Sequence, residues 1–196
     1  MKTANKRNDL IQIGSQIIVK QGFKAASINQ ILTAAGVPKG SFYYYFSSKE
    51  DFGLAIINDF AGRYQNKLDN ILGNETLSPL ARLREYFELG IADMKDSECA
   101  HGCLMGNLAQ ELSAQNELFR DRLSQVFADW EASFTECLQA AEAAGEISSN
   151  KDISNLAKFI LSGWQGSILQ AKVAKSVSPM ENFLEIVFET LLVRDF

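Results

Sequence analysis

Two short segments of this sequence hold residue types that could do chemistry. The first, Lys39-Gly40-Ser41, places a positive charge, a residue without a side chain and a hydroxyl in successive positions. Such a segment lets a backbone come close to DNA, while lysine and serine donate hydrogen bonds to base edges and phosphates. Lys49, further along, adds another positive charge. This segment therefore predicts contact with double-stranded DNA.

Three consecutive tyrosines, Tyr43, Tyr44 and Tyr45, follow the first segment. One interpretation is an aromatic core patch. Successive residues of a helix point about 100° apart, however, so the three rings cannot all enter a core. Phe42 and Phe46, four residues apart, are better placed to face inward. We therefore expect at least one tyrosine hydroxyl to face solvent or a ligand.

The second segment places two thiols and the only histidine of the chain, Cys99, His101 and Cys103, within five residues. A zinc site would have three ligands here and no evident fourth, so we expect no bound metal. A reactive thiol at Cys103 is the stronger interpretation. A helix N-terminus and a protonated His101 would both favour the thiolate, which is the reactive form. A buried structural cysteine is the alternative.

Short helices are expected to position the first segment. The apolar spacing predicts a helix over about 6–21. Ser27 and Gln30 have the spacing of a capping box at the start of a second helix, which ends at Gly36. A third short helix is expected to begin near Lys39. Two short helices joined by a turn of about three residues predict a helix-turn-helix.

Residues 22–49, GFKAASINQILTAAGVPKGSFYYYFSSK, resemble the DNA-binding domain of TetR-family transcriptional regulators. In that family a Thr or Ser caps the second helix and A-G-V forms the turn. The pattern K-G-x-h-Y-x-[HY]-F-x-x-K then spans the recognition helix and the start of the next helix. The matching positions here are Ser27, Ala35, Gly36, Val37, Lys39, Gly40, Tyr43, Tyr45, Phe46 and Lys49.

The resemblance implies a role for each matched region. It implies a DNA-binding domain over 1–48, a helical effector-binding and dimerisation domain over 49–196, and a homodimer that binds a palindromic operator, usually as a repressor. Base edges would be approached by Lys39, Gly40, Ser41 and Tyr43, and phosphates would be held by Ser27, Tyr44, Tyr45 and Lys49.

Charge is also distributed unevenly between the N-terminal part and the rest of the chain. The net charge is -5, yet residues 1–50 contain seven Lys and Arg against two Asp and Glu, whereas the remaining 146 residues contain twelve against twenty-two. A basic N-terminal part suits a polyanionic partner. No apolar run reaches the roughly 20 residues that span a bilayer, and the N-terminus has no apolar signal segment. We expect a cytoplasmic protein without a membrane partner.

The rest of the chain also reads as helix, so the predicted fold class is all-α. Apolar spacing, glycines and prolines predict further helices over about 48–73, 79–95, 101–113, 116–144, 152–175 and 180–193. The sequence contains no P-loop, dinucleotide-binding glycines, metal-ligand spacing or G-x-S-x-G. Neither an enzyme nor a cofactor is expected.

The helix over 152–175 is apolar or small over much of its circumference, so it needs neighbours on more than one side. A partner subunit would supply one of them, and a central helix in a monomer is the alternative. In the resembled family the last two helices of each protomer form the dimer interface. The residues that this assigns to the interface are Gly163, Gly166, Ser167, Phe183 and Val187.

The sequence indicates the effector less clearly than it indicates the DNA-binding segment. Aromatic and methionine side chains of the C-terminal part could line a cavity for a small apolar molecule, or could be plain core. Gly102-Cys103-Leu104 resembles the sensing segment of the NemR-like, electrophile-responsive branch of the TetR family, which implies an electrophilic effector instead. The candidate sensing residues are Cys103 and His101, together with Phe87, Met94, Met105, Trp130, Phe134 and Trp164.

Two other function classes are alternatives to a DNA-binding regulator. A helical enzyme would need a polar constellation in the C-terminal part. A helical dimeric small-molecule-binding or interaction protein would account for the predicted dimer surface. Neither class gives a reason for a basic N-terminal part with Lys39-Gly40-Ser41 and flanking tyrosines, so a TetR-type repressor is the prediction.

Overall fold

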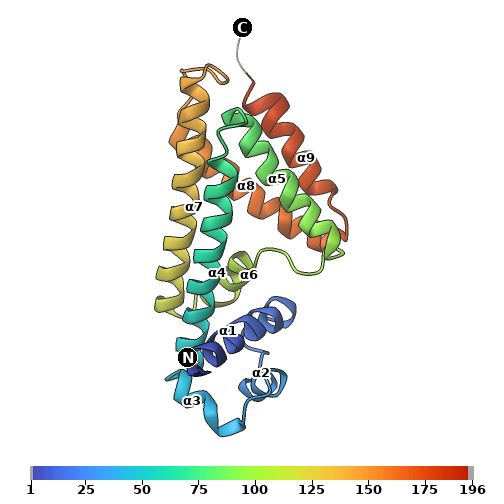
Figure 1. Cartoon of the computed structure of the whole chain (residues 1–196). Coiled ribbons are helices and arrows are strands. Elements are labelled where there is room, and N and C mark those ends of the chain that lie inside the picture. Colours follow the sequence, from blue (N-terminus) through green and yellow to red (C-terminus); the bar gives the residue numbers. More distant parts are fainter. Residues whose placement is uncertain (1, 194–196) are drawn as a thin grey trace. The chain divides into compact units, whose positions relative to one another are not determined.

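A computed structural model describes residues 2–193, and every regular element in that range is helical, as Figure 1 shows. The all-α prediction is confirmed. None of the described helices is both long enough and apolar enough to cross a membrane. The helices are α1 (Lys2–Gln21), α2 (Ile28–Ala34), the 3-10 turn η1 (Lys39–Ser41), α3 (Phe42–Tyr45), α4 (Lys49–Leu72), α5 (Pro79–Asp96), α6 (Leu104–Leu112), α7 (Glu117–Ala143), α8 (Ile153–Ala174), α9 (Ser178–Ile186) and the π-helical turn η2 (Val187–Leu191).

The chain forms two compact units. The first unit combines the residues up to Arg63 with Cys103–Ser124, and the second combines Tyr64–Gly102 with the residues from Gln125 onward. Helices α4 and α7 therefore each contribute to both units. The functional boundary expected after residue 48 coincides with the start of α4 and stays a prediction.

The first unit packs α1, α2, α3 and the start of α4 around apolar side chains. Helices α1 and α4 come close at Gly14, where an added Cβ would clash with Cζ of the Phe52 ring. A larger residue at position 14 would have to displace a buried ring. The buried side chains of this region include Leu10, Ile18, Ile31, Leu32, Phe42, Phe46 and Phe52.

The second unit has an aromatic core. Helices α5 and α8 approach at Gly90, where an added Cβ would lie 2.6 Å from Cζ2 of Trp164. Helix α8 packs against α9, and α5 also contacts α9. In Figure 1 these three helices, drawn in green, orange and red, lie together. Because Gly90 has no side chain, the Trp164 indole can occupy the space beside it in this core.

Three helix ends differ from the predicted ones by more than two residues. Helix α1 begins at Lys2 instead of residue 6. Helix α6 begins at Leu104 instead of residue 101, because the backbone at Cys99 (φ 54°) and Gly102 (φ 67°) is left-handed and cannot belong to an α-helix. Helix α9 ends at Ile186 and continues as a π-helical turn.

The capping box predicted at α2 is only half formed. The Ser27 hydroxyl accepts a hydrogen bond from the backbone N–H of Gln30, at 3.1 Å. The Gln30 side chain instead pairs with Gln21, whose amide donates to Oε1 of Gln30 at 2.8 Å. Gln21 lies at the end of α1, so a partner from another helix replaces the local backbone one.

Candidate DNA interface and sensing site

The helix-turn-helix is built by α2 and α3 with a glycine turn between them. Helix α2 is capped by Ser27, and Gly36 has a φ of +62° that suits a residue without a side chain. The backbone N–H of Val37 donates to the Leu32 carbonyl at 2.9 Å and closes the turn. Val37 is buried in the first unit, and the predicted burial of Phe42 there is confirmed. The turn therefore fixes how Lys39-Gly40-Ser41 follows α2.

The expected division of the aromatic side chains is also found. Phe42 and Phe46 are buried, and their ring centroids lie 5.5 Å apart. Tyr43 is 69% exposed and Tyr44 is 74% exposed, which is unusual for large aromatic residues. Tyr45 is half-buried, with its ring centroid 5.1 Å from that of Tyr44. The prediction that at least one tyrosine faces solvent is confirmed.

The lysine-glycine-serine segment forms η1, directly before α3. Lys39 and Gly40 are exposed and Ser41 is half-buried. A Cβ added at Gly40 meets no atom within 4 Å, so the space beside this backbone is open. Ser27 is exposed as well, although its hydroxyl already accepts the capping hydrogen bond of α2.

Lys49 is less available than the other candidate DNA contacts. Its Nζ donates to the carbonyl oxygen of Lys24 at 3.2 Å and lies 4.9 Å from the centroid of the Phe23 ring. Burial lowers the pKa of Lys49, and the nearby Glu111 carboxylate opposes that shift. Lys49, the first residue of α4, thus bonds to the turn between α1 and α2.

Glu111 is a further residue of this region, and the sequence gives no sign of its role. Its carboxylate accepts hydrogen bonds from the backbone N–H groups of Phe23 at 2.8 Å and Lys24 at 2.7 Å. These partners lie 88 and 87 residues away in the chain. No local pattern could have identified them, because the contact depends on how α6 packs against α1.

Cys103 is the N-cap residue of α6. Its Sγ accepts from the backbone N–H of Gly106 at 3.5 Å, and the side chain is half-buried. The expectation that Cys103 lies at a helix N-terminus is confirmed. His101 is half-buried and lies two residues earlier in the chain. Within residues 2–193, His, Cys, Asp and Glu side chains form no cluster of three or more that could hold a metal ion.

The other two cysteines are less accessible. Cys99 is 4% exposed and Cys137 is 6% exposed. Burial raises the pKa of the Cys137 thiol to about 11, with Arg82 opposing and Glu146 adding to the shift. This thiol donates to the Pro79 carbonyl at 3.2 Å. Cys137 is therefore a protonated, hydrogen-bonded thiol at neutral pH.

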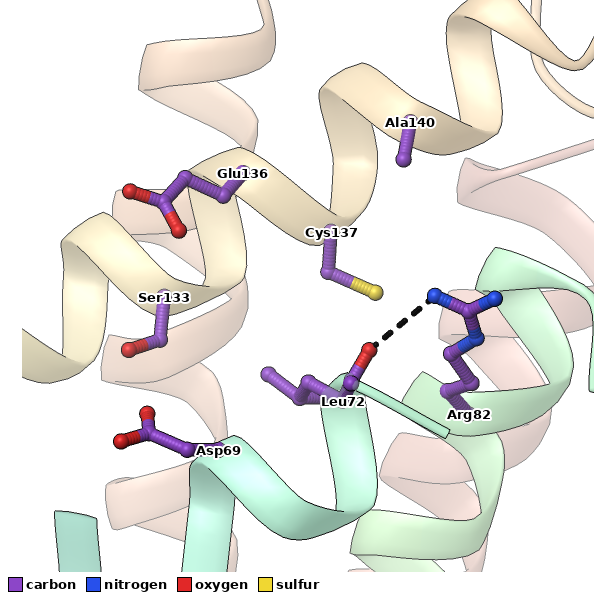
Figure 2. Close-up of a pocket in the computed structure, with 8 residues that line it drawn as sticks. Asp69, Leu72, Arg82, Ser133, Glu136, Cys137 and Ala140 are labelled. Atoms are coloured by element: carbon purple, nitrogen blue, oxygen red, sulfur yellow. Dashed lines mark hydrogen bonds between the residues drawn. The ribbon is translucent and has the colours of Figure 1, made fainter. Parts of the chain in front are cut away.

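A cavity of about 350 Å³ opens beside Cys137, between α4, α5 and α7. Figure 2 shows Arg82 reaching across to the end of α4, where its Nη1 donates to the Leu72 carbonyl at 3.2 Å. The Nε of Arg82 donates to the Leu77 carbonyl at 2.9 Å. The Arg82 guanidinium and the Cys137 thiol thus stabilise the backbone of the connection between α4 and α5.

The aromatic and methionine candidates for the effector site are all buried, whereas Cys103 and His101 are half-buried. Phe87 joins an aromatic cluster with Phe134 and Trp164, at centroid distances of 5.7 Å and 4.8 Å. Trp130 packs against Tyr64 at 4.7 Å. Met94 lies in the second unit, whereas Met105 belongs to α6 in the first unit. The structure therefore brings Phe87, Phe134 and Trp164 together within the second unit.

The candidate dimer residues lie in α8, α9 and η2. Ser167 and Val187 are buried, and Gly163 packs against the Phe183 ring of its own chain, since an added Cβ would lie 2.7 Å from Cε2. Gly166, by contrast, has open space beside it. All five line a groove of about 350 Å³, whose other lining residues are Phe159, Gln170, Pro179, Asn182 and Ile186.

Two parts of the sequence match domain descriptions of the tetracycline-repressor type. Residues 10–56 match "Bacterial regulatory proteins, tetR family", and residues 79–187 match "Tetracyclin repressor-like, C-terminal domain". The first match spans α2 and α3 with the turn between them, and the second spans α5 to the start of η2. Both parts of the chain are thus accounted for by one family.

Individual relatives agree. The chain is 34% identical to the HTH-type transcriptional repressor DhaR of Mycobacterium sp. (strain GP1), over 95% of this chain and 92% of the relative. It is 37% identical to the transcriptional regulator AcuR of Cereibacter sphaeroides, over 89% and 80%. The crystal structure of reduced NemR from E. coli matches with a TM-score of 0.86 and 28% identity, covering 94% of this chain and 97% of that one. The relatives are transcriptional regulators, not enzymes, and the chain belongs to the TetR family of bacterial transcriptional regulators.

Proposed function

We propose that this protein is a transcriptional repressor that binds a palindromic DNA operator as a homodimer. The observation that carries the proposal is the solvent exposure of Tyr43 and Tyr44 beside the open backbone of Gly40. Burying an aromatic ring is favourable, so two rings directed outward from one short helix suit a surface that meets a partner. Lys39 is exposed beside them and supplies the positive charge that a polyanion requires.

Within this proposal the candidate side chains divide into two groups. Lys39, Gly40, Ser41 and Tyr43 approach base edges in the major groove and set the sequence preference. Ser27, Tyr44, Tyr45 and Lys49 donate to phosphates and fix the register of the protein on the duplex.

The homodimer is supported by the surface of α8 and α9. Phe159 is 61% exposed and Val173 is 80% exposed, and Leu169 and Ile186 also present apolar side chains to solvent. The groove at Gly166 lies on the same two helices. A second copy that covers these side chains would remove apolar surface from water and relate two recognition helices by a twofold axis.

The proposed effector is a small apolar or electrophilic molecule. It would release the protein from operator DNA by one of two routes. In the first, a noncovalent ligand enters the second unit beside Phe87, Phe134 and Trp164. In the second, an electrophile adds to the Cys103 thiolate at the N-terminus of α6, with His101 nearby in the chain. The exposure of Cys103 relative to the buried Cys99 and Cys137 supports the second route.

Selection of bound duplexes from random DNA tests the proposal. The wild-type chain is expected to enrich a palindrome whose half-sites lie about one helical turn apart, roughly 34 to 36 Å. The Ser41→Ala variant should bind with a relaxed preference at one position of each half-site. Failure to enrich any sequence would favour a helical dimeric interaction protein without DNA binding.

A further inference from the structure

Helix α6 is attached to the turn between α1 and α2 by one carboxylate. Oε2 of Glu111 accepts from the backbone N–H of Phe23 at 2.8 Å, and Oε1 accepts from that of Lys24 at 2.7 Å. Both oxygens of the side chain are therefore used on two successive peptide groups. Charge-assisted hydrogen bonds of this kind are roughly twice as strong as neutral ones.

The end of α1 leaves these N–H groups available. Gly22 adopts a φ of +87°, and its N–H bonds to the Ile18 carbonyl at 2.8 Å. This is the simpler left-handed helix end, in which the next N–H does not return to the helix. A Cβ at Gly22 would lie 3.0 Å from Oε2 of Glu111, so the carboxylate also occupies the space that a side chain would need. The turn is shaped to receive Glu111.

The same turn is held from its carbonyl side by Lys49. The Nζ of Lys49 donates to the Lys24 carbonyl at 3.2 Å, and its charge lies over the Phe23 ring. The peptide groups of Phe23 and Lys24 are thus fixed between a carboxylate of α6 and an ammonium group at the start of α4. We call this arrangement of Glu111, Phe23, Lys24 and Lys49 the turn clamp.

Apolar and polar contacts around the turn clamp keep it in register. The Phe23 ring packs edge-on against Phe119 of α7, with centroids 5.3 Å apart. A Cβ at Gly53 of α4 would lie 2.6 Å from Phe23 and 2.7 Å from Phe119. The Lys24 ammonium also donates to the side-chain oxygen of Gln115, which follows α6.

We propose that Glu111 is a positioning residue that couples α6 to the DNA-binding helices through the turn clamp. Cys103 is the N-cap residue of α6, and Glu111 lies about two turns further along the helix, so a displacement of the helix start would be transmitted as a displacement of the carboxylate. The turn it holds leads directly into Ser27 and α2. The consequence for operator binding rests on the proposed function, whereas the coupling itself does not.

Amide hydrogen exchange of the full chain, without DNA, tests the coupling. Glu111→Gln removes the charge and replaces one acceptor by a donor. Glu111→Asp keeps the charge but withdraws the carboxylate by one methylene. In both variants the amides of Phe23 and Lys24 should exchange about tenfold faster, the effect of losing one hydrogen bond to a charged group. Exchange that is unchanged in both variants would overturn the proposal.

Glu117→Gln is the matched control, because Glu117 is exposed and pairs only locally, 3.2 Å from Arg120. It removes the same charge from the same unit, and should leave exchange at Phe23 and Lys24 unchanged. Equal acceleration in Glu117→Gln would show a general charge effect and overturn the proposal.

Binding measurements then separate the two proposals. The affinity of Glu111→Gln for the selected operator should fall about tenfold relative to Glu117→Gln, with random DNA bound equally by both. Faster exchange with unchanged operator affinity would overturn the positioning role. If the wild-type chain binds no DNA, the proposed function fails, and the exchange result alone decides whether α6 is coupled to the turn.

Discussion

The ammonium group of Lys49 lies 3.2 Å from the carbonyl oxygen of Lys24, so the lysine at the start of α4 is bonded to the turn between α1 and α2. The same lysine is the last residue of the TetR-family pattern, and the resemblance to that family implies a phosphate contact for it. A lysine has three donors, and one bond to a carbonyl leaves others for a phosphate. The bond to the Lys24 carbonyl therefore orients the Lys49 side chain and leaves its other donors for the implied phosphate contact.

Lys49→Ala should weaken binding to all DNA sequences and reduce the slope of log affinity against log salt by about one, because one phosphate contact is lost. Lys67→Ala is the control, since Lys67 belongs to the second unit and pairs with Asp93 at 2.9 Å. Fluorescence anisotropy over a salt series measures both. An identical slope in wild type and Lys49→Ala would restrict Lys49 to its internal contact.

Gly166→Arg should convert the chain to a monomer of about 21.7 kDa and reduce operator affinity at the same time. An added Cβ at Gly166 meets no atom within 4 Å, so the protomer itself tolerates the change. Gly62→Arg is the matched control, because Gly62 in α4 is equally open. Light scattering decides the outcome, and a Gly166→Arg chain that keeps the wild-type mass would contradict the proposed interface.

Cys103 should react with N-ethylmaleimide faster than Cys99 or Cys137, because it is the most accessible of the three thiols and lies at a helix N-terminus. The thiolate adds to the maleimide double bond, and a proton from solvent completes the succinimide. Mass spectrometry of the digested protein identifies the modified residue.

Release from operator DNA should accompany that modification, since an added group must favour one conformation over the other to act as a signal. Cys103→Ser should bind DNA normally and no longer respond, whereas Cys137→Ala should respond like the wild type. A response that persists in Cys103→Ser would favour a noncovalent effector in the second unit.

Cys137 should make stability depend on pH in the alkaline range. Its folded pKa of about 11 lies above the ordinary value of 9.0, so the folded state holds the proton more tightly than the unfolded state. The resulting stability is present below pH 9 and is lost as the pH rises through 11. The loss should be about 2 to 3 kcal/mol at most.

The difference between wild type and Cys137→Ala isolates this effect, because the other titrating groups are common to both chains. Urea unfolding at pH 8, 9, 10 and 11 gives the free energy of unfolding of each. The free energies of unfolding of wild type and Cys137→Ala should converge as the pH rises above 9. A constant difference over the whole range would mean that the thiol does not titrate differently in the folded state.

Several features of this protein were determined by local sequence alone. The four-residue spacing of Phe42 and Phe46 predicted that both rings face inward. Both are buried while Tyr43 and Tyr44 face outward, although Phe46 is the extended C-cap residue of α3. Gly22 and Gly36 end α1 and α2 because their backbones adopt positive φ. These outcomes depend on neighbours within a few residues, and so the helix-turn-helix and the family could be read before the fold.

Other features were decided only by the tertiary structure. Gln30 pairs with Gln21 of α1 instead of completing its capping box, and Lys49 bonds to the Lys24 carbonyl. Glu111 meets the amides of Phe23 and Lys24 across nearly ninety residues of chain, a relationship without any periodic or local signature. Such contacts arise because the packing of helices selects which polar groups meet, and a buried or half-buried group accepts the partner that packing presents. The sequence determines which hydrogen-bond donors and acceptors are present, whereas the packing of the helices determines which of them pair.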